Sequence, residues 1–104
     1  GKNRLIDQLK IFVEKLSKDF KIDNIILFGS RTGKNFTEES DVDLIIVSED
    51  FIGKDFFERG AKMYEYWDID LPVDFICYTP EEFNKLKKRI SLVSYALKEG
   101  VIIN

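Results

Sequence analysis

The sequence has no histidine and a single cysteine among its 104 residues. Without histidine the chain has neither a Ser–His catalytic pair nor a zinc site with histidine ligands. One cysteine cannot form an intrachain disulfide, and Cys77 lies in an apolar run over residues 73–78, so we interpret it as a small core residue. Any catalysis must therefore depend on carboxylates, hydroxyls, amines or a bound metal.

The sequence also lacks a run of eighteen apolar residues and a charged-then-apolar leader. We therefore expect a cytoplasmic protein that does not enter a membrane. The net charge of −3 argues against direct nucleic-acid binding, because proteins that neutralise phosphates usually carry a basic face. The short basic cluster at Lys85, Lys87, Lys88 and Arg89 is interpreted as a solvated helix face.

The apolar residues, 44% of the chain, follow periods that predict one domain over residues 1–104. Strands that alternate with helices indicate an α/β or α+β fold, with helices packed on a mixed sheet of three to four strands. Thr79, Pro80 and Glu82 supply a capping box for one of the helices. The expected elements are a helix over residues 3–20, a strand over 25–28, a loop over 31–40, a strand over 42–47, a helix over 54–67, a strand over 73–78, helices over about 80–89 and 92–98, and an edge strand over 101–103.

Two aspartates, Asp41 and Asp43, stand two apart at the start of the second expected strand. Side chains alternate along a strand, so both carboxylates are expected on one face. Adjacent negative charges repel, and a divalent cation such as Mg²⁺, which prefers hard oxygen ligands, removes that conflict. An Asp-x-Asp pair alone is a weak signal in an acidic chain.

Asp74 interrupts an otherwise apolar strand, where an unpaired carboxylate is costly. If this strand neighbours the one that bears Asp41 and Asp43, three carboxylates converge, enough to hold two Mg²⁺ ions for an in-line phosphoryl displacement. The alternative is that Asp74 is a solvent-exposed residue at a strand start. Asp68 and Asp70 are interpreted as loop residues rather than ligands.

Gly29 and Ser30 directly follow the first expected strand. Glycine lets the backbone turn sharply and approach a ligand, and exposed amides at such a turn can bind phosphate. The Ser30 hydroxyl can add a hydrogen bond, and Arg31 or Lys34 can supply positive charge. A lone Gly-Ser pair is usually only a turn.

The combination of these features resembles the nucleotidyltransferase superfamily typified by DNA polymerase β. Its signature is Gly-Ser, about ten residues, Asp-x-Asp, and a third acidic residue on a later strand; here residues 31–40 separate Gly29-Ser30 from Asp41-Val42-Asp43. The resemblance implies that Asp41, Asp43 and Asp74 bind two Mg²⁺ ions and catalyse nucleotidyl transfer. It also implies that Gly29, Ser30 and Arg31 bind the triphosphate of ATP or another nucleoside triphosphate.

The end of the sequence, Glu99-Gly100-Val101-Ile102, resembles that of the smallest family members, the minimal nucleotidyltransferases. Those members are paired with a helical HEPN-type protein in toxin–antitoxin systems, and relatives add AMP to that partner. The resemblance therefore implies an antitoxin that adenylylates a HEPN-type toxin. Two alternatives stay open: an antitoxin that neutralises its partner by contact without catalysis, and a transferase for small molecules such as aminoglycosides.

Aromatic residues are dense between residues 56 and 67, more than one helix needs to bury. We expect most of them to be core residues and part of this stretch to be a partner surface. The residues concerned are Phe56, Phe57, Tyr64, Tyr66 and Trp67.

Overall fold

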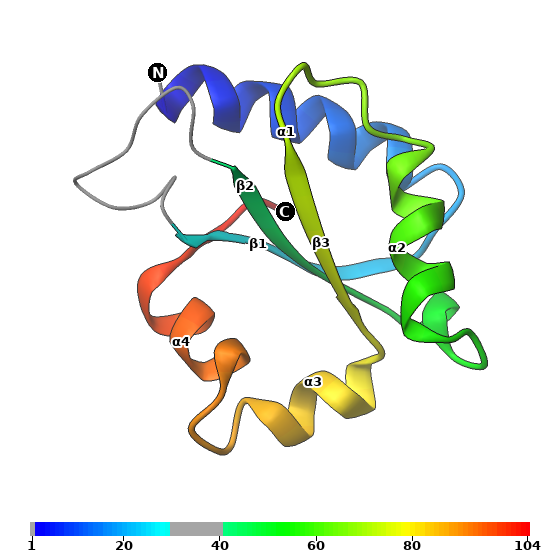
Figure 1. Cartoon of the computed structure of the whole chain (residues 1–104), viewed down its shortest axis with the longest axis vertical. Coiled ribbons are helices and arrows are strands. Elements are labelled where there is room, and N and C mark those ends of the chain that lie inside the picture. Colours follow the sequence, from blue (N-terminus) through cyan, green and yellow to red (C-terminus); the bar gives the residue numbers. More distant parts are fainter. Residues whose placement is uncertain (1, 30–40) are drawn as a thin grey trace.

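A four-stranded sheet with helices on both faces makes up the computed structural model, which describes residues 2–29 and 41–104 (Figure 1). The expected loop over residues 31–40 lies outside the described residues. The elements in chain order are α1 (Lys2–Leu16), β1 (Ile22–Phe28), β2 (Val42–Ser48), the short 3₁₀ helix η2 (Glu49–Phe51), α2 (Phe56–Tyr64), β3 (Val73–Tyr78), α3 (Pro80–Leu86), α4 (Leu92–Glu99) and β4 (Val101–Ile102).

The strands are ordered β3-β2-β1-β4 across the sheet. β1 pairs antiparallel with both β2 and β4, whereas β2 and β3 are parallel. Parallel neighbours need a crossover connection, and α2 lies in the segment that provides it. The prediction of a mixed sheet is therefore confirmed, as is the edge position of the last strand.

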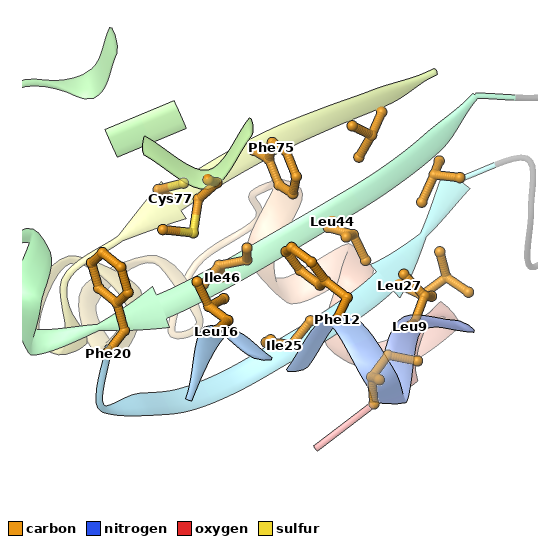
Figure 2. Close-up of a cluster of buried hydrophobic side chains, with 14 of the residues drawn as sticks. Leu9, Phe12, Leu16, Phe20, Ile25, Leu27, Leu44, Ile46, Phe75 and Cys77 are labelled. Atoms are coloured by element: carbon orange, nitrogen blue, oxygen red, sulfur yellow. The ribbon is translucent and has the colours of Figure 1, made fainter. Parts of the chain in front are cut away.

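The larger core lies between the sheet and the helices α1 and α2 (Figure 2). Leu9, Phe12 and Leu16 recur at helical spacing on α1 and point toward the side chains of the strands. The helix ends at Leu16, four residues before the expected end, because residues 17–19 form a turn. Phe20 follows this turn and is buried, so it belongs to the core although it is not part of the helix.

The opposite face of the sheet is covered by α3 and α4, which bury Phe83, Val93 and Ala96 against it. Both helices begin at capping boxes, and the predicted one at Thr79 and Glu82 is confirmed. α3 ends at Leu86 rather than near residue 89, where the chain turns. The basic residues around this turn are exposed, as predicted: Lys85, Lys87, Lys88 and Arg89.

The helix α2 is shorter than the expected span because Asp55 caps it and residues 65 and 66 form a turn. The aromatic residues of this stretch divide into two sets. Tyr66 and Trp67 are partly buried and pack against the core, but the expectation that most of the five residues belong to the core is wrong. Three rings remain exposed: Phe56, Phe57 and Tyr64.

Cys77 is a core residue, as expected. It is buried in the larger core, and burial raises the pKa of its thiol to about 12, so it is not a thiolate nucleophile at neutral pH. Within residues 2–29 and 41–104, no helix has the length and apolar character that a membrane crossing requires.

A buried arginine joins α2 to α3. The guanidinium of Arg59 donates to both carboxylate oxygens of Glu82, to the carbonyl oxygen of Cys77 and to that of Lys54. Arg59 is 9% exposed, whereas the side chain of Glu82 is 45% exposed. Glu82 also accepts from the amide of Thr79, so one carboxylate both caps α3 and pairs with α2.

This arrangement makes the stability depend on pH. The hydrogen bond from Arg59 is the main cause that lowers the pKa of Glu82, so the contribution is present above the unfolded pKa and is lost as pH falls through the folded one. We expect Glu82→Gln to reduce the free energy of unfolding by about 1 kcal/mol or less near pH 7, after solvent screening. Urea unfolding between pH 7 and 3 measures this difference, which should shrink below about pH 4. Glu81→Gln, an exposed neighbour on the same helix, is the control and should show no such shrinkage.

Candidate active site

Gly29 lies against Asp43 at the point where β1 ends. Phe28 and Asp43 are register partners in the antiparallel pair, so Gly29 follows directly beside the aspartate. Gly29 has a φ of +84°, which side-chain-bearing residues rarely adopt. A Cβ atom there would stand 2.3 Å from Oδ2 of Asp43. Glycine is therefore required both for the backbone conformation and for the closeness of the carboxylate.

Asp43 and Asp74 are direct register partners in the parallel strands β2 and β3. Partners at the same level of neighbouring strands present their side chains on the same face. Ile45 and Ile76 stand two residues after Asp43 and Asp74, so they lie on the same face of the sheet as these aspartates. Both isoleucines pack in the core under α3 and α4, so the two aspartates also lie on that face. The two strands that carry the aspartates are therefore neighbours, as expected.

The local electrostatics of Asp43 show how close these carboxylates are. Burial is the main cause that raises the pKa of the half-buried Asp43 carboxyl. The negative charges of Asp74 and Asp41 raise it further, and so does a hydrogen bond with the Asp74 carboxyl. The group thus holds its negative charge at a cost that a nearby cation would offset.

Asp41 is exposed and directly precedes β2. Its charge reaches Asp43, yet no three carboxylate or thiolate side chains of the described segments form a group that could hold a metal ion. Mg²⁺ is usually held by one or two carboxylates together with waters and substrate phosphates, not by an all-protein cage. The hard oxygen donors, their mutual repulsion and a neighbouring backbone that carries no Cβ at Gly29 fit such a shared site.

Ser30 and Arg31, the other two predicted phosphate-binding residues, lie outside the described residues, as does Lys34. The structure therefore places Gly29, Asp41, Asp43 and Asp74 of the predicted set. Asp68 and Asp70 lie in the loop before β3, and Asp68 pairs with Lys15, so neither joins the acidic pair.

An aromatic cluster positions the strand that carries Asp74. The ring of Phe75 contacts Phe12, Tyr64 and Trp67, with centroids 5.9, 4.9 and 5.6 Å away. The hydroxyl of Tyr64 donates to the carbonyl oxygen of Val73, 2.5 Å away. Residues of α1 and α2 thereby hold β3 in place from the face opposite Asp74. This fixes the position of the Asp74 carboxylate next to Asp43.

Three features of this region were not predicted from the sequence. Arg59 is buried at the edge of β3, Tyr64 binds the backbone of that strand, and Gly29 contacts Asp43. The Gly-Ser motif could have suggested the contact of Gly29 with Asp43, since glycine in such a motif implies that another group lies close to the backbone. No sequence signal distinguishes Arg59 from the other cations of the chain.

The chain is similar to known proteins in both sequence and fold. The model of the family described as "Nucleotidyltransferase domain" matches residues 9–102. The structure is similar to a crystal structure from Sulfolobus solfataricus described as a "putative nucleotidyltransferase", with a TM-score of 0.69 and 22% identity over 97% of this chain and 80% of that one. At this identity the similarity shows the fold. No match was found among the curated proteins.

Proposed function

This chain belongs to the nucleotidyltransferase domain family, and we propose that it transfers AMP from ATP to a hydroxyl group of a partner protein. The observation that carries the proposal is the pairing of Asp43 with Asp74 across β2 and β3, next to Gly29. Two close carboxylates beside a backbone that has no Cβ suit a Mg²⁺–triphosphate ligand.

Each residue of the site has a proposed role. Asp41 and Asp43 would hold the Mg²⁺ ions, and Asp74 would complete the set of carboxylates. Mg²⁺, when bound, neutralises the charge of the phosphates and of the carboxylates. Gly29 lets the triphosphate approach the backbone, and Ser30 and Arg31 are proposed to bind its oxygens.

In the proposed reaction the oxygen of the acceptor hydroxyl forms a bond to the α-phosphorus of ATP. The bond between that phosphorus and the oxygen bridging to the β-phosphate breaks, and pyrophosphate leaves with the electron pair. Asp74, an exposed carboxylate, accepts the proton of the hydroxyl and releases it to solvent. The products are an AMP ester of the acceptor and pyrophosphate.

The proposed acceptor is a helical HEPN-type protein, with this chain as the antitoxin. The resemblance to minimal nucleotidyltransferases supports this identity. Independent support for a protein acceptor comes from exposed aromatic residues close to Asp74: Phe56, Phe57 and Tyr64 line one hollow with that aspartate. Large exposed apolar side chains in a cluster mark protein-interaction surfaces.

Incubation with the protein encoded next to this one, Mg²⁺ and either α-labelled or γ-labelled ATP tests the proposal. Label is expected on the partner only from α-labelled ATP, because the γ-phosphate leaves in pyrophosphate. Asp41→Ala should reduce the transfer by at least about 100-fold, since it removes a metal ligand. Asp70→Ala, which changes the same charge in the loop, is the control and should transfer normally.

Equal transfer by wild type and Asp41→Ala would show that the site is assigned wrongly. Label found only on added aminoglycosides would favour the small-molecule alternative instead.

A further inference from the structure

We propose that the acceptor is held as an extended protein segment in a groove along the β3 edge of the sheet. One end of the groove is at Asp74, where the hydroxyl reacts, and the other is a basic pocket at Arg89, where an acidic side chain of the segment binds. This inference rests on the proposed function and adds the surface and chemistry that select the acceptor.

The first part of the groove is the hollow next to Asp74, with a volume of about 560 Å³. Its walls are largely apolar and come from Phe56, Phe57 and Tyr64 of α2 and from Phe75 of β3. Phe57 is 84% exposed, and Phe56 and Tyr64 are about half exposed. A segment that covers these rings gains apolar burial directly beside the reacting carboxylate.

The second part is a hollow of about 430 Å³ between the start of α2 and the end of α3. Its lining includes apolar surface from Cys77, Tyr78 and Leu86. Its four cationic side chains are Lys54, Arg59, Lys85 and Arg89, against the two acidic side chains Asp55 and Glu82.

The charges of this pocket do not cancel. Glu82 is paired with Arg59, and Lys85 with Glu81 outside the pocket lining, whereas Asp55 caps α2. Lys54 and Arg89 have no acidic partner among the ion pairs of the described residues. The pocket therefore suits an anionic group attached to an apolar or aliphatic stem.

Phe56 lines both hollows, so the two adjoin at this residue. β3 runs beside them, with Asp74 near its start and Cys77 and Tyr78 at its end. Four strand residues span about 13 Å, which is the reach of about four residues of an extended peptide. The hydroxyl residue and the acidic residue of the acceptor are thus expected about four positions apart.

The occupant binds through side chains rather than as an added strand. β3 is an edge strand, but the carbonyl oxygens of Val73 and Cys77 already accept hydrogen bonds from the side chains of Tyr64 and Arg59. These contacts occupy two of the carbonyl groups with which a fifth strand would pair. Selection therefore depends on apolar contact with α2 and on charge at Arg89.

Synthetic peptides test the charge requirement. The probe is an unstructured nine-residue peptide with one hydroxyl residue (Ser, Thr or Tyr) and a Glu four positions before or after it; a second set carries Lys in place of Glu. With α-labelled ATP and Mg²⁺, we expect the Glu peptides to have a KM about five- to tenfold lower than the Lys peptides, with kcat similar. Arg89→Glu should reverse this preference, whereas Lys88→Glu, the same charge change one residue away, should not.

The apolar part has its own pair of variants. Phe57→Ser should raise the KM of the Glu peptides about tenfold, because a phenyl contact is lost. Ile90→Ser removes a fully exposed apolar side chain that lines neither hollow and should leave KM unchanged. Urea unfolding of all variants checks that the fold is retained.

The outcomes separate the two levels of the proposal. If wild type labels Glu and Lys peptides equally, or if Arg89→Glu and Lys88→Glu behave alike, the proposal that the groove binds the acceptor is overturned. The proposed transferase function then still stands. The same holds if wild type labels an intact protein but none of the peptides. If wild type labels neither proteins nor peptides, the proposed function itself has failed.

Discussion

Asp43→Asn is expected to reduce AMP transfer by about 1,000-fold or more while the fold becomes slightly more stable. Asp43 is the most enclosed of the three carboxylates and the one that both others repel. Asparagine keeps the shape but loses the negative charge that a divalent cation requires, and metal-dependent charge stabilisation contributes several kcal/mol to such reactions. Activity should therefore fall by orders of magnitude.

The gain in stability has a separate cause. Burial and two neighbouring charges raise the pKa of Asp43, which means that the folded chain disfavours its ionised form. Replacing the charge by a neutral amide relieves this repulsion in metal-free buffer. We expect the free energy of unfolding to rise by about 1 kcal/mol or less, because the side chain is only partly buried.

Two measurements on the same variant check this pair of effects. Label transfer from α-labelled ATP gives the activity, and urea unfolding in EDTA gives the stability. Asp23→Asn, an exposed residue of β1, is the control for the change of charge and should alter neither. Because pure binding does not require this carboxylate, a partner that is neutralised equally by wild type and Asp43→Asn would favour the non-catalytic antitoxin.

Gly29→Ala is expected to lower the transfer rate about 100-fold. A Cβ at this position would lie 2.3 Å from Oδ2 of Asp43, closer than any real contact, so the carboxylate must move. Displacement of a reacting group by about 1 Å can cost about 100-fold in rate. The positive φ of +84° adds a cost of about 1–2 kcal/mol to folding.

The chain contains a matched control for this substitution. Gly53 has a similar φ of +82°, but nothing lies within 4 Å of a Cβ built there. Gly53→Ala should therefore lose about the same 1–2 kcal/mol in urea unfolding and yet retain normal transfer. Equal rates for the two variants would mean that the contact with Asp43 has no part in catalysis.

The sequence by itself predicted most of the local structure, because the signals involved lie within a few residues of one another. The capping box at Thr79 and Glu82 set the start of α3, and the apolar run from Val73 predicted β3 with its observed bounds. Helix ends were predicted less well. Phe20 and Trp67 look like helical positions by their spacing, but both follow turns and belong to the core.

The acidic site could be predicted only as a set of candidates. The motifs nominated Asp41, Asp43 and Asp74, but their proximity depends on which strand lies beside β2, and that is decided by contacts between distant segments. The parallel register that pairs Asp43 with Asp74 requires α2 to cross over and Phe75 to pack against α1 and α2.

Gly29 and the surface around α2 show the same division. The sequence predicted a turn at Gly29, since glycine favours such a turn, whereas the tertiary structure decided that Gly29 lies in close contact with Asp43. Likewise, composition showed an excess of aromatic residues, and packing decided that Tyr66 and Trp67 are partly buried in the core while Phe56 and Phe57 remain exposed. Local conformation depends on neighbours in the chain, but burial and the meeting of side chains depend on how the whole sheet is ordered.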